Sequence, residues 1–284
     1  MDEFKITAQR YGKRKVRVLR VERLSDGTHK IHEVDVAVFL DGDVLPAYYG
    51  NDNSGVVATD TIKNTIQALA QKHLGDVIEV FALTLGDHFL AKYPHMTRTV
   101  VEVASRTWDR YIRPDGSAHP HTFLGGSTTP ITKVDMTRSS VKVESGIRDL
   151  LLLKSTGSGW AGYPRDEYTT LPETTDRILS TQVEGNWTFA NRSVDFGKAN
   201  RAILAALLNT FAETYSPSVQ NTLYSSAKAA LEAVADVVEI SFALPNKHYL
   251  LVNLSPFGLQ NNSEIFLPTD EPHGQIEARI SRSA

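Results

Sequence analysis

Hydrophobic and polar residues alternate over 31–40 and again over 15–23, with a Ser-Asp-Gly turn between the two segments. Alternation with a period of two turns one row of side chains toward a core and the other toward solvent, so both segments are predicted β-strands. In the earlier segment the apolar parity changes between Val18 and Leu19. One extra residue in a strand produces such a change, and we therefore expect a β-bulge at this point.

The following segments change to helical periodicity. Apolar residues spaced three and four apart predict helices near 60–72 and 77–91. Asp60 or Thr61 is a competent N-cap for the first of them. Thr59 then lies where free backbone N–H groups and the positive end of the helix dipole meet, which suits a small anion or an electron-rich oxygen. Taken alone, the segment is more simply interpreted as a capped surface helix.

The same order of elements returns in the second half of the chain. A strand at 97–108 and a Gly/Ser/Thr/Pro-rich loop at 125–130 close the first set. The second set has strands near 132–154 and 179–190, helices near 197–214 and 218–234, and strands at 238–244 and 250–254. The helix pairs are offset by roughly 140 residues, which suggests two ββααββ units. We therefore predict an α+β fold with one domain over 1–130 and a second over 131–284, each an antiparallel four-stranded sheet with two helices on one face.

Composition excludes several classes of function. A chain of 284 residues with 41% hydrophobic and 22% charged residues is typical of a globular protein, and a net charge of −3 favours neither a nucleic-acid nor a membrane partner. The absence of cysteine excludes disulfides, cysteine-based metal sites and a thiol nucleophile. No nucleotide, nicotinamide or flavin motif is present. His119-Pro120-His121 has no third ligand nearby in the sequence, so we expect no metal site.

Five segments occur in a fixed order: YGK at 11–13, VVATDTIKNT at 56–65, LKSTGSGWAGYPRDEYTTLPETTDRIL at 153–179, SPSVQNTLY at 216–224 and LPNKHY at 244–249. Together they resemble the urate oxidase (uricase) family, from about Tyr11 to a last strand near Ile280. The resemblance implies tandem tunnelling-fold (T-fold) domains, whose sheets join across subunits into a barrel. It also implies a homotetramer with active sites at subunit interfaces. The implied reaction oxidises urate with O2 to 5-hydroxyisourate and H2O2, without a metal or an organic cofactor.

The two ends of the chain bear on its location. The amino-terminal segment is too charged for a secretory signal, and no apolar run has the length of a membrane span. The chain ends in SRSA, whereas eukaryotic uricases commonly carry a peroxisomal tripeptide of the SKL type. We therefore expect a cytoplasmic enzyme.

The resemblance assigns catalysis to Lys13, Thr59 and His248. A Thr hydroxyl is a poor base unless a neighbouring amine accepts or shares its proton, and the family pattern pairs this Lys with this Thr. His248, expected in a turn between two strands, would be the third member of a system that moves protons through a bound water. Without the resemblance, the simpler interpretation of Lys13 is a residue of a solvated charge cluster, and that of His248 is a half-buried histidine in a turn.

The remaining site residues would hold the substrates. Arg177 and Gln220 are the implied clamp, because an Arg fork satisfies both the charge and the acceptors of an oxopurine anion and a Gln amide offers one donor and one acceptor. The simpler interpretation of Arg177 is an ion pair with Glu173 on a helix surface. Asn246 would hold dioxygen or water above the ring. Backbone contacts and apolar walls are implied at Asp60, Val219, Leu171 and Ile276.

Trp160 departs from the family pattern, which usually places Phe at this position to stack on the purine. Indole keeps a stacking face and adds an N–H that needs a partner when it is buried. The simpler interpretation is a core aromatic, with Tyr163 nearest to the ligand. Two other functions stay open: another T-fold purine or pterin enzyme, and an inactive purine-binding homologue, which would be expected to lose Lys13, Thr59 or His248.

Overall fold

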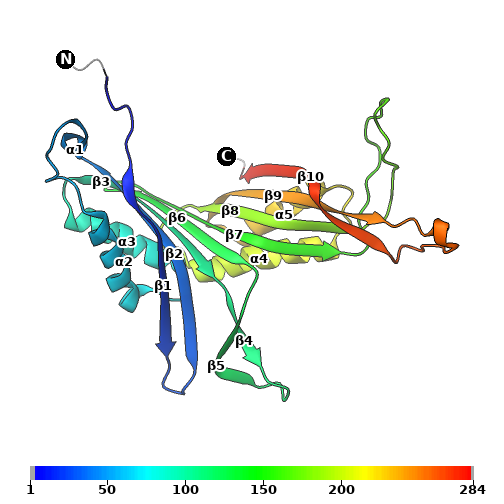
Figure 1. Cartoon of the computed structure of the whole chain (residues 1–284), viewed down its shortest axis with the longest axis horizontal. Helices are drawn as coiled ribbons and strands as arrows, with labels where there is room; N and C mark the ends of the chain where they lie inside the picture. Colours follow the sequence, from blue (N-terminus) through cyan, green and yellow to red (C-terminus); the bar gives the residue numbers. More distant parts are fainter. Residues whose placement is uncertain (1–3, 283–284) are drawn as a thin grey trace. The chain divides into compact units, whose positions relative to one another are not determined.

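The computed structural model describes residues 4–282 (Figure 1). The last two residues of the chain, on which the interpretation of the carboxyl-terminal tripeptide depends, lie outside this range. The chain divides into two compact units, one made of Met1–Gly146 and Thr188–Gly197, the other of Ile147–Trp187 and Lys198–Ala284. This division concerns compactness rather than repetition, and the domain boundary after residue 130 stays a prediction. Within the described residues, no helix combines the length and the apolar character needed to cross a membrane.

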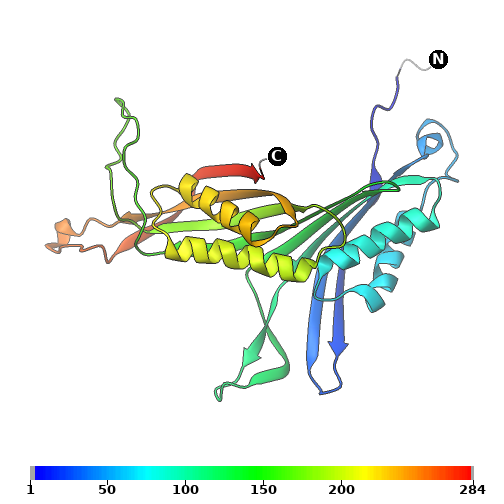
Figure 2. The same ribbon diagram turned by 180° about the vertical axis from the view of Figure 1, so that it is seen from behind.

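The first unit contains antiparallel strands with two long helices on one face (Figure 2). Its strands are neighbours in the order β1 (Tyr11–Arg23), β2 (His29–Gly42), β3 (Met96–Arg106) and β6 (Thr129–Thr137). Its helices are α1 (Leu45–Tyr49), α2 (Thr59–His73) and α3 (Ile78–Lys92). A separate hairpin consists of β4 (Trp108–Ile112) and β5 (Ala118–Gly125). The alternating valines of β2 and the apolar face of α3 are fully or almost fully buried, so they form the core of this unit.

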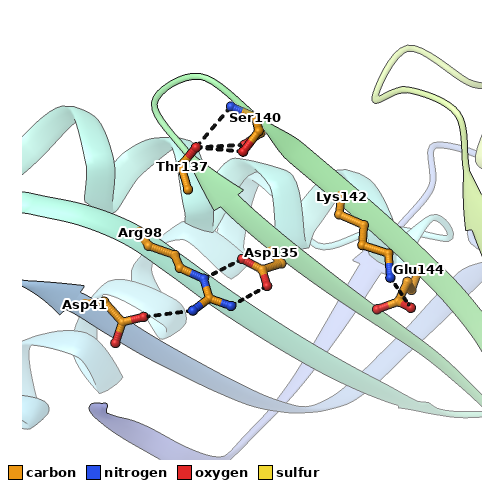
Figure 3. A network of polar contacts seen from close by, with 7 residues as sticks. All are labelled: Asp41, Arg98, Asp135, Thr137, Ser140, Lys142 and Glu144. Carbon is orange, nitrogen blue, oxygen red and sulfur yellow. Dashed lines mark hydrogen bonds and ion pairs between the residues drawn. The ribbon is translucent and has the colours of Figure 1, made fainter. Parts of the chain in front are cut away.

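An ion-pair network ties three neighbouring strands of the first unit together (Figure 3). The Arg98 guanidinium donates from Nε and Nη2 to the two carboxylate oxygens of Asp135, at 2.7 and 2.6 Å, and Nη1 lies 3.4 Å from Asp41. The hydrogen bond from Arg98 holds the pKa of Asp135 below its usual value. A bidentate pair of this kind has a fixed geometry and so supports the pairing of β3 with β6.

The second unit repeats the arrangement. Strands β7 (Val141–Lys154, in this unit from Ile147 onward), β8 (Leu179–Phe189), β9 (Val237–Leu251) and β10 (Phe266–Ser281) are neighbours in this order. The helices are α4 (Phe196–Glu213) and α5 (Val219–Ala233), and α5 packs on β9 and β10. A short 3₁₀ turn, η1 (Ser255–Phe257), lies between β9 and β10. The predicted α+β class is thus confirmed, with antiparallel strands and helices on one face.

Three local predictions were wrong. The strand expected at 250–254 does not form, because β9 continues through Leu251 and its partner is β10. The bulge in β1 lies between Lys13 and Val16, where Lys15 has a φ of +57°; Leu19 is simply exposed, so the parity does not change. Helix α2 begins at Thr59, and Ala58, which has no side-chain cap, precedes it.

Candidate active site

In the first unit, the structure brings the YGK and VATD segments together. The backbone N–H of Val57 donates to the hydroxyl of Tyr11 at 2.9 Å, which ties the start of β1 to the chain entering α2. Burial raises the pKa of Tyr11, so this phenol stays protonated and keeps its fixed partner. Sequence reasoning gave Tyr11 no role beyond its place in the motif, because nothing in the spacing of the two segments shows that they touch.

Lys13 lies half-buried on β1, next to a glycine that allows very close strand approach. A Cβ on Gly12 would stand 2.0 Å from the carbonyl oxygen of Val38 on β2. Only a residue without a side chain fits there. The β-bulge begins directly after Lys13. The backbone of Lys13 is therefore constrained on one side by the close strand contact at Gly12 and on the other side by the bulge.

Thr59 and Asp60 occupy the first turn of α2 and are exposed. Asp60 does not cap the helix as predicted, because its carboxylate accepts hydrogen bonds from Lys63 and Asn64 within the same helix. The hydrogen bond from Lys63 is the main reason that the pKa of Asp60 is lowered, and the charge of Lys13 adds to it. Lys13 is therefore close enough to this turn to act electrostatically on it, and the first backbone N–H groups of α2 are available to a ligand.

In the second unit, the site residues depend on the long loop that joins β7 to β8 and projects from the sheet in Figure 1. Backbone hydrogen bonds run in both directions between Trp160 and Thr174, at 2.7 and 3.0 Å. Asp176 accepts from the Thr156 hydroxyl and the Gly157 N–H. The loop is thus closed on itself at its base by backbone and side-chain bonds.

Arg177 emerges from this base and has no counter-ion among the described residues. Its guanidinium is half-buried, and the Nε atom is buried without a hydrogen-bond partner within residues 4–282. Burial lowers the pKa of Arg177, although a guanidinium stays charged at any ordinary pH. The ion pair with Glu173 is not formed, because Glu173 instead accepts from the Gly162 N–H at 3.0 Å and the segment is not helical. A buried donor that lacks a partner is costly unless a ligand satisfies it.

His248 and Asn246 lie within β9, and not in a turn as predicted from the sequence. Every second residue of a strand shares a face, and along this face Phe242 and Leu244 are buried whereas Asn246 and His248 are half-buried. The paired strand β10 bulges between the partners of these two residues. The face of β9 that packs into the core therefore carries polar side chains toward the C-terminal end of the strand.

The neutral form of the His248 imidazole is favoured, because its pKa is lowered. Burial is the largest cause of its lowered pKa, followed by the positive charge of Arg177 and by His273. The coupling to Arg177 places the two predicted site residues in one electrostatic environment. A neutral imidazole can accept a proton as well as donate one, as a proton-transfer role requires.

Helix α5 presents Val219 and Gln220 in its first turn. The Ser218 hydroxyl caps the helix by accepting from the Asn221 N–H at 3.1 Å. Val219 is buried and Gln220 is exposed. The Gln220 amide is thus held at a helix start, where backbone N–H groups also point outward.

The residues predicted to form aromatic and apolar walls differ in their exposure. Trp160 is half-buried and stacks on Tyr163, with ring centroids 5.5 Å apart. Leu171 is 55% exposed, and Ile276 is half-buried on β10 opposite Leu244. The sequence allows Tyr163 as an alternative ligand contact, whereas the structure places its ring against the indole.

The β4–β5 hairpin brings its histidine pair close to a third histidine ring. The rings of His119 and His121 lie 4.6 Å apart, and a third ring, that of His29 on β2, lies 5.8 Å from His121. Within residues 4–282, however, no group of three acidic, histidine or cysteine side chains is arranged to hold a metal ion.

The sequence and the fold match known proteins over nearly their whole length. The family described as "Uricase" matches residues 9–135 and 143–277. The uricase of Dictyostelium discoideum is 40% identical over 276 residues, covering 96% of this chain and 96% of that protein. The uricase of Arabidopsis thaliana is 41% identical over 295 residues, covering 96% of this chain and 95% of that protein. The crystal structure of uricase from Arthrobacter globiformis matches with a TM-score of 0.92 at 39% identity, covering 99% of this chain and 96% of that one.

Proposed function

This chain belongs to the uricase family and oxidises urate with O2, and we propose that Arg177 is the anchor that holds the urate anion. The observation that carries the proposal is the half-buried guanidinium, whose Nε has no partner within the described residues. Urate is a flat oxopurine that is anionic at neutral pH and has carbonyl acceptors along its edge. Its binding would supply both the missing acceptor and the missing counter-charge.

The other residues form hydrogen bonds along the edge of the purine and pack against its faces. The Gln220 amide offers a donor and an acceptor to the pyrimidine edge, and backbone groups of Val219 and Asp60 add hydrogen bonds at two helix starts. The indole of Trp160 stacks on one face of the ring. Leu171 and Ile276 form the apolar walls of the pocket.

Protons move through Lys13, Thr59 and His248. Lys13 accepts or shares the Thr59 proton, so the hydroxyl can act as a base toward a bound water, and the neutral His248 takes part in the same transfer. Asn246 holds dioxygen or water above the ring. Urate gives two electrons to O2, and water adds to the oxidised ring, so that urate, O2 and H2O yield 5-hydroxyisourate and H2O2. The electron-rich anion takes the place of a metal or an organic cofactor, and the protein supplies orientation and electrostatics.

The pocket is completed by a second subunit. Thr59 and Asp60 are exposed to solvent, whereas a proton relay works best when its members are shielded from water, so another chain has to cover them. Among residues 4–282, β1 and β10 are also edge strands, and a neighbouring chain can pair with such an edge. We place the sites at the interfaces of a homotetramer, with Thr59 and Asp60 supplied by the neighbouring subunit.

The test is an oxidation assay with chelator-treated protein. We expect loss of the near-ultraviolet absorbance of urate, with one H2O2 formed per urate consumed. Arg177→Gln should lower the affinity for the unreactive analogue 8-azaxanthine by about 10²-fold, because hydrogen bonds to charged groups contribute about 1.5–3 kcal/mol. Arg192→Gln is the matched control, since that guanidinium is already paired with Asp87. Loss of absorbance without H2O2 would contradict the oxidase chemistry, and an unchanged affinity in Arg177→Gln would contradict the anchor.

A further inference from the structure

The Trp160 indole lies against the ring of Tyr163 in a parallel stack. The ring centroids are 5.5 Å apart and the planes differ by only 12°. Parallel, offset aromatic pairs at this separation are favourable and restrict the rotation of both rings. From this geometry we infer that Tyr163 is a positioning residue. It fixes the plane of the Trp160 ring and the position of Leu171, the apolar wall of the pocket, for the bound purine. The inference rests on the proposed function.

Tyr163 is itself held at both ends. Its hydroxyl donates to the backbone carbonyl of Leu171, on the opposite limb of the loop. The chain between the two rings reverses at Gly162, whose φ is +74°, and the Gly162 N–H donates to Glu173 at 3.0 Å. A residue with a Cβ is strained at such a φ, so the turn that overlaps the two rings depends on this glycine. The Arg165 guanidinium lies over the Tyr163 ring at 6.0 Å and adds a cation to the same cluster.

The stack leaves one face of the indole for the ligand. A planar ring has two faces, and Tyr163 covers one of them, while the backbone of Trp160 is bonded in both directions to Thr174. The remaining face is therefore held in a fixed plane, and Trp160 is half-buried rather than closed off in a core. A purine that stacks on this face finds the indole already ordered, so little rotamer entropy is lost on binding.

The hydroxyl of Tyr163 extends this effect to a second wall. Leu171 is 55% exposed, and its backbone carbonyl is held by the phenol. One side chain thereby connects the stacking face of the pocket with its apolar wall. Tyr163→Phe would keep the stack on Trp160 but remove the hydrogen bond to Leu171, which separates the two effects experimentally.

The test measures binding of 8-azaxanthine and the steady-state oxidation of urate in three variants. Tyr163→Leu should raise the Kd of the analogue and the KM for urate about tenfold, because it removes both the stack and the hydrogen bond. Tyr163→Phe should raise them about threefold, since it removes the hydrogen bond alone. In both variants kcat should stay within about twofold of the original, because no proton-transfer group is touched. Tyr168→Leu is the control, because Tyr168 lies in the same loop and is 82% exposed.

The outcomes distinguish this inference from the proposed function. If the unaltered protein neither oxidises urate nor binds the analogue, the proposed function fails. If it does both, and Tyr163→Leu behaves like Tyr168→Leu, only the positioning role is overturned. If Tyr163→Leu does not fold, Tyr163→Phe decides, and an unchanged Kd in that variant refutes the role of the hydroxyl and with it the inference. A fall in kcat with unchanged KM would also refute it, because positioning of a binding surface acts on affinity.

Discussion

At the scale of single residues, His248 is the group whose protonation state most directly controls the proposed chemistry. Burial, the charge of Arg177 and His273 all lower its pKa, so the neutral form persists below the ordinary value of about 6.5. Activity that depends on neutral His248 is fully present above that value and is lost as the pH falls through the lowered pKa. The same sign holds for stability, because an unfolded chain binds this proton more readily and is favoured as the pH falls below about 6.5.

We therefore expect the acid limb of kcat/KM for urate to lie below pH 6.5. In His248→Gln this limb should disappear, and the rate should fall about 10²-fold. His273→Gln is the informative control, since it removes a neighbouring group that lowers the pKa of His248. In that variant the acid limb should move to higher pH while the rate at the plateau is kept. An acid limb that stays in His248→Gln would assign the titration to another group.

At the scale of elements, periodicity was sufficient to predict those segments with a buried face. The four long helices and strand β2 form where apolar spacing predicted them, because burial of one face determines both the element and its orientation. The Pro-Asn-Lys-His segment was misplaced in a turn for the opposite reason. It is stabilised in β9 by pairing with β10, the next strand along the chain, and the pattern within the segment itself does not report such a partner. The stack of Trp160 on Tyr163 was invisible for the same reason, since it depends on the turn at Gly162 and on the far limb of the loop.

The close approach of β1 to β2 at Gly12 gives a prediction at this scale, because it constrains the backbone next to Lys13. A Cβ at Gly12 would lie 2.0 Å from the Val38 carbonyl oxygen, so Gly12→Ala must push β1 away from β2. We expect destabilisation by about 1–3 kcal/mol, the usual cost of overpacking. Turnover should fall by about 10-fold or more in protein that is still folded, because displacement of a catalytic group is costly.

Gly75→Ala is the control, as nothing lies within 4 Å of a Cβ at that position. A melting curve and kcat measured together would show the two effects, and loss of stability with unchanged kcat would mean that the close strand contact at Gly12 does not position Lys13.

At the scale of the whole molecule, the order of the motifs along the chain was sufficient to predict the family. The sharing of the active site between subunits has to be tested directly. If Thr59 of one subunit completes a pocket begun by Arg177 of another, Thr59→Ala and Arg177→Ala each leave an inactive enzyme. Mixed tetramers then contain some pockets with both original residues. Random exchange between equal amounts of the two variants should restore about a quarter of the pockets, since each half of a pocket is drawn independently. The measurement is urate oxidation before and after subunit exchange, with mixed tetramers verified by native mass spectrometry of differently tagged chains. Tetramers that mix by mass and yet recover no activity would place Thr59 and Arg177 of one pocket in the same chain, and the shared site would be refuted.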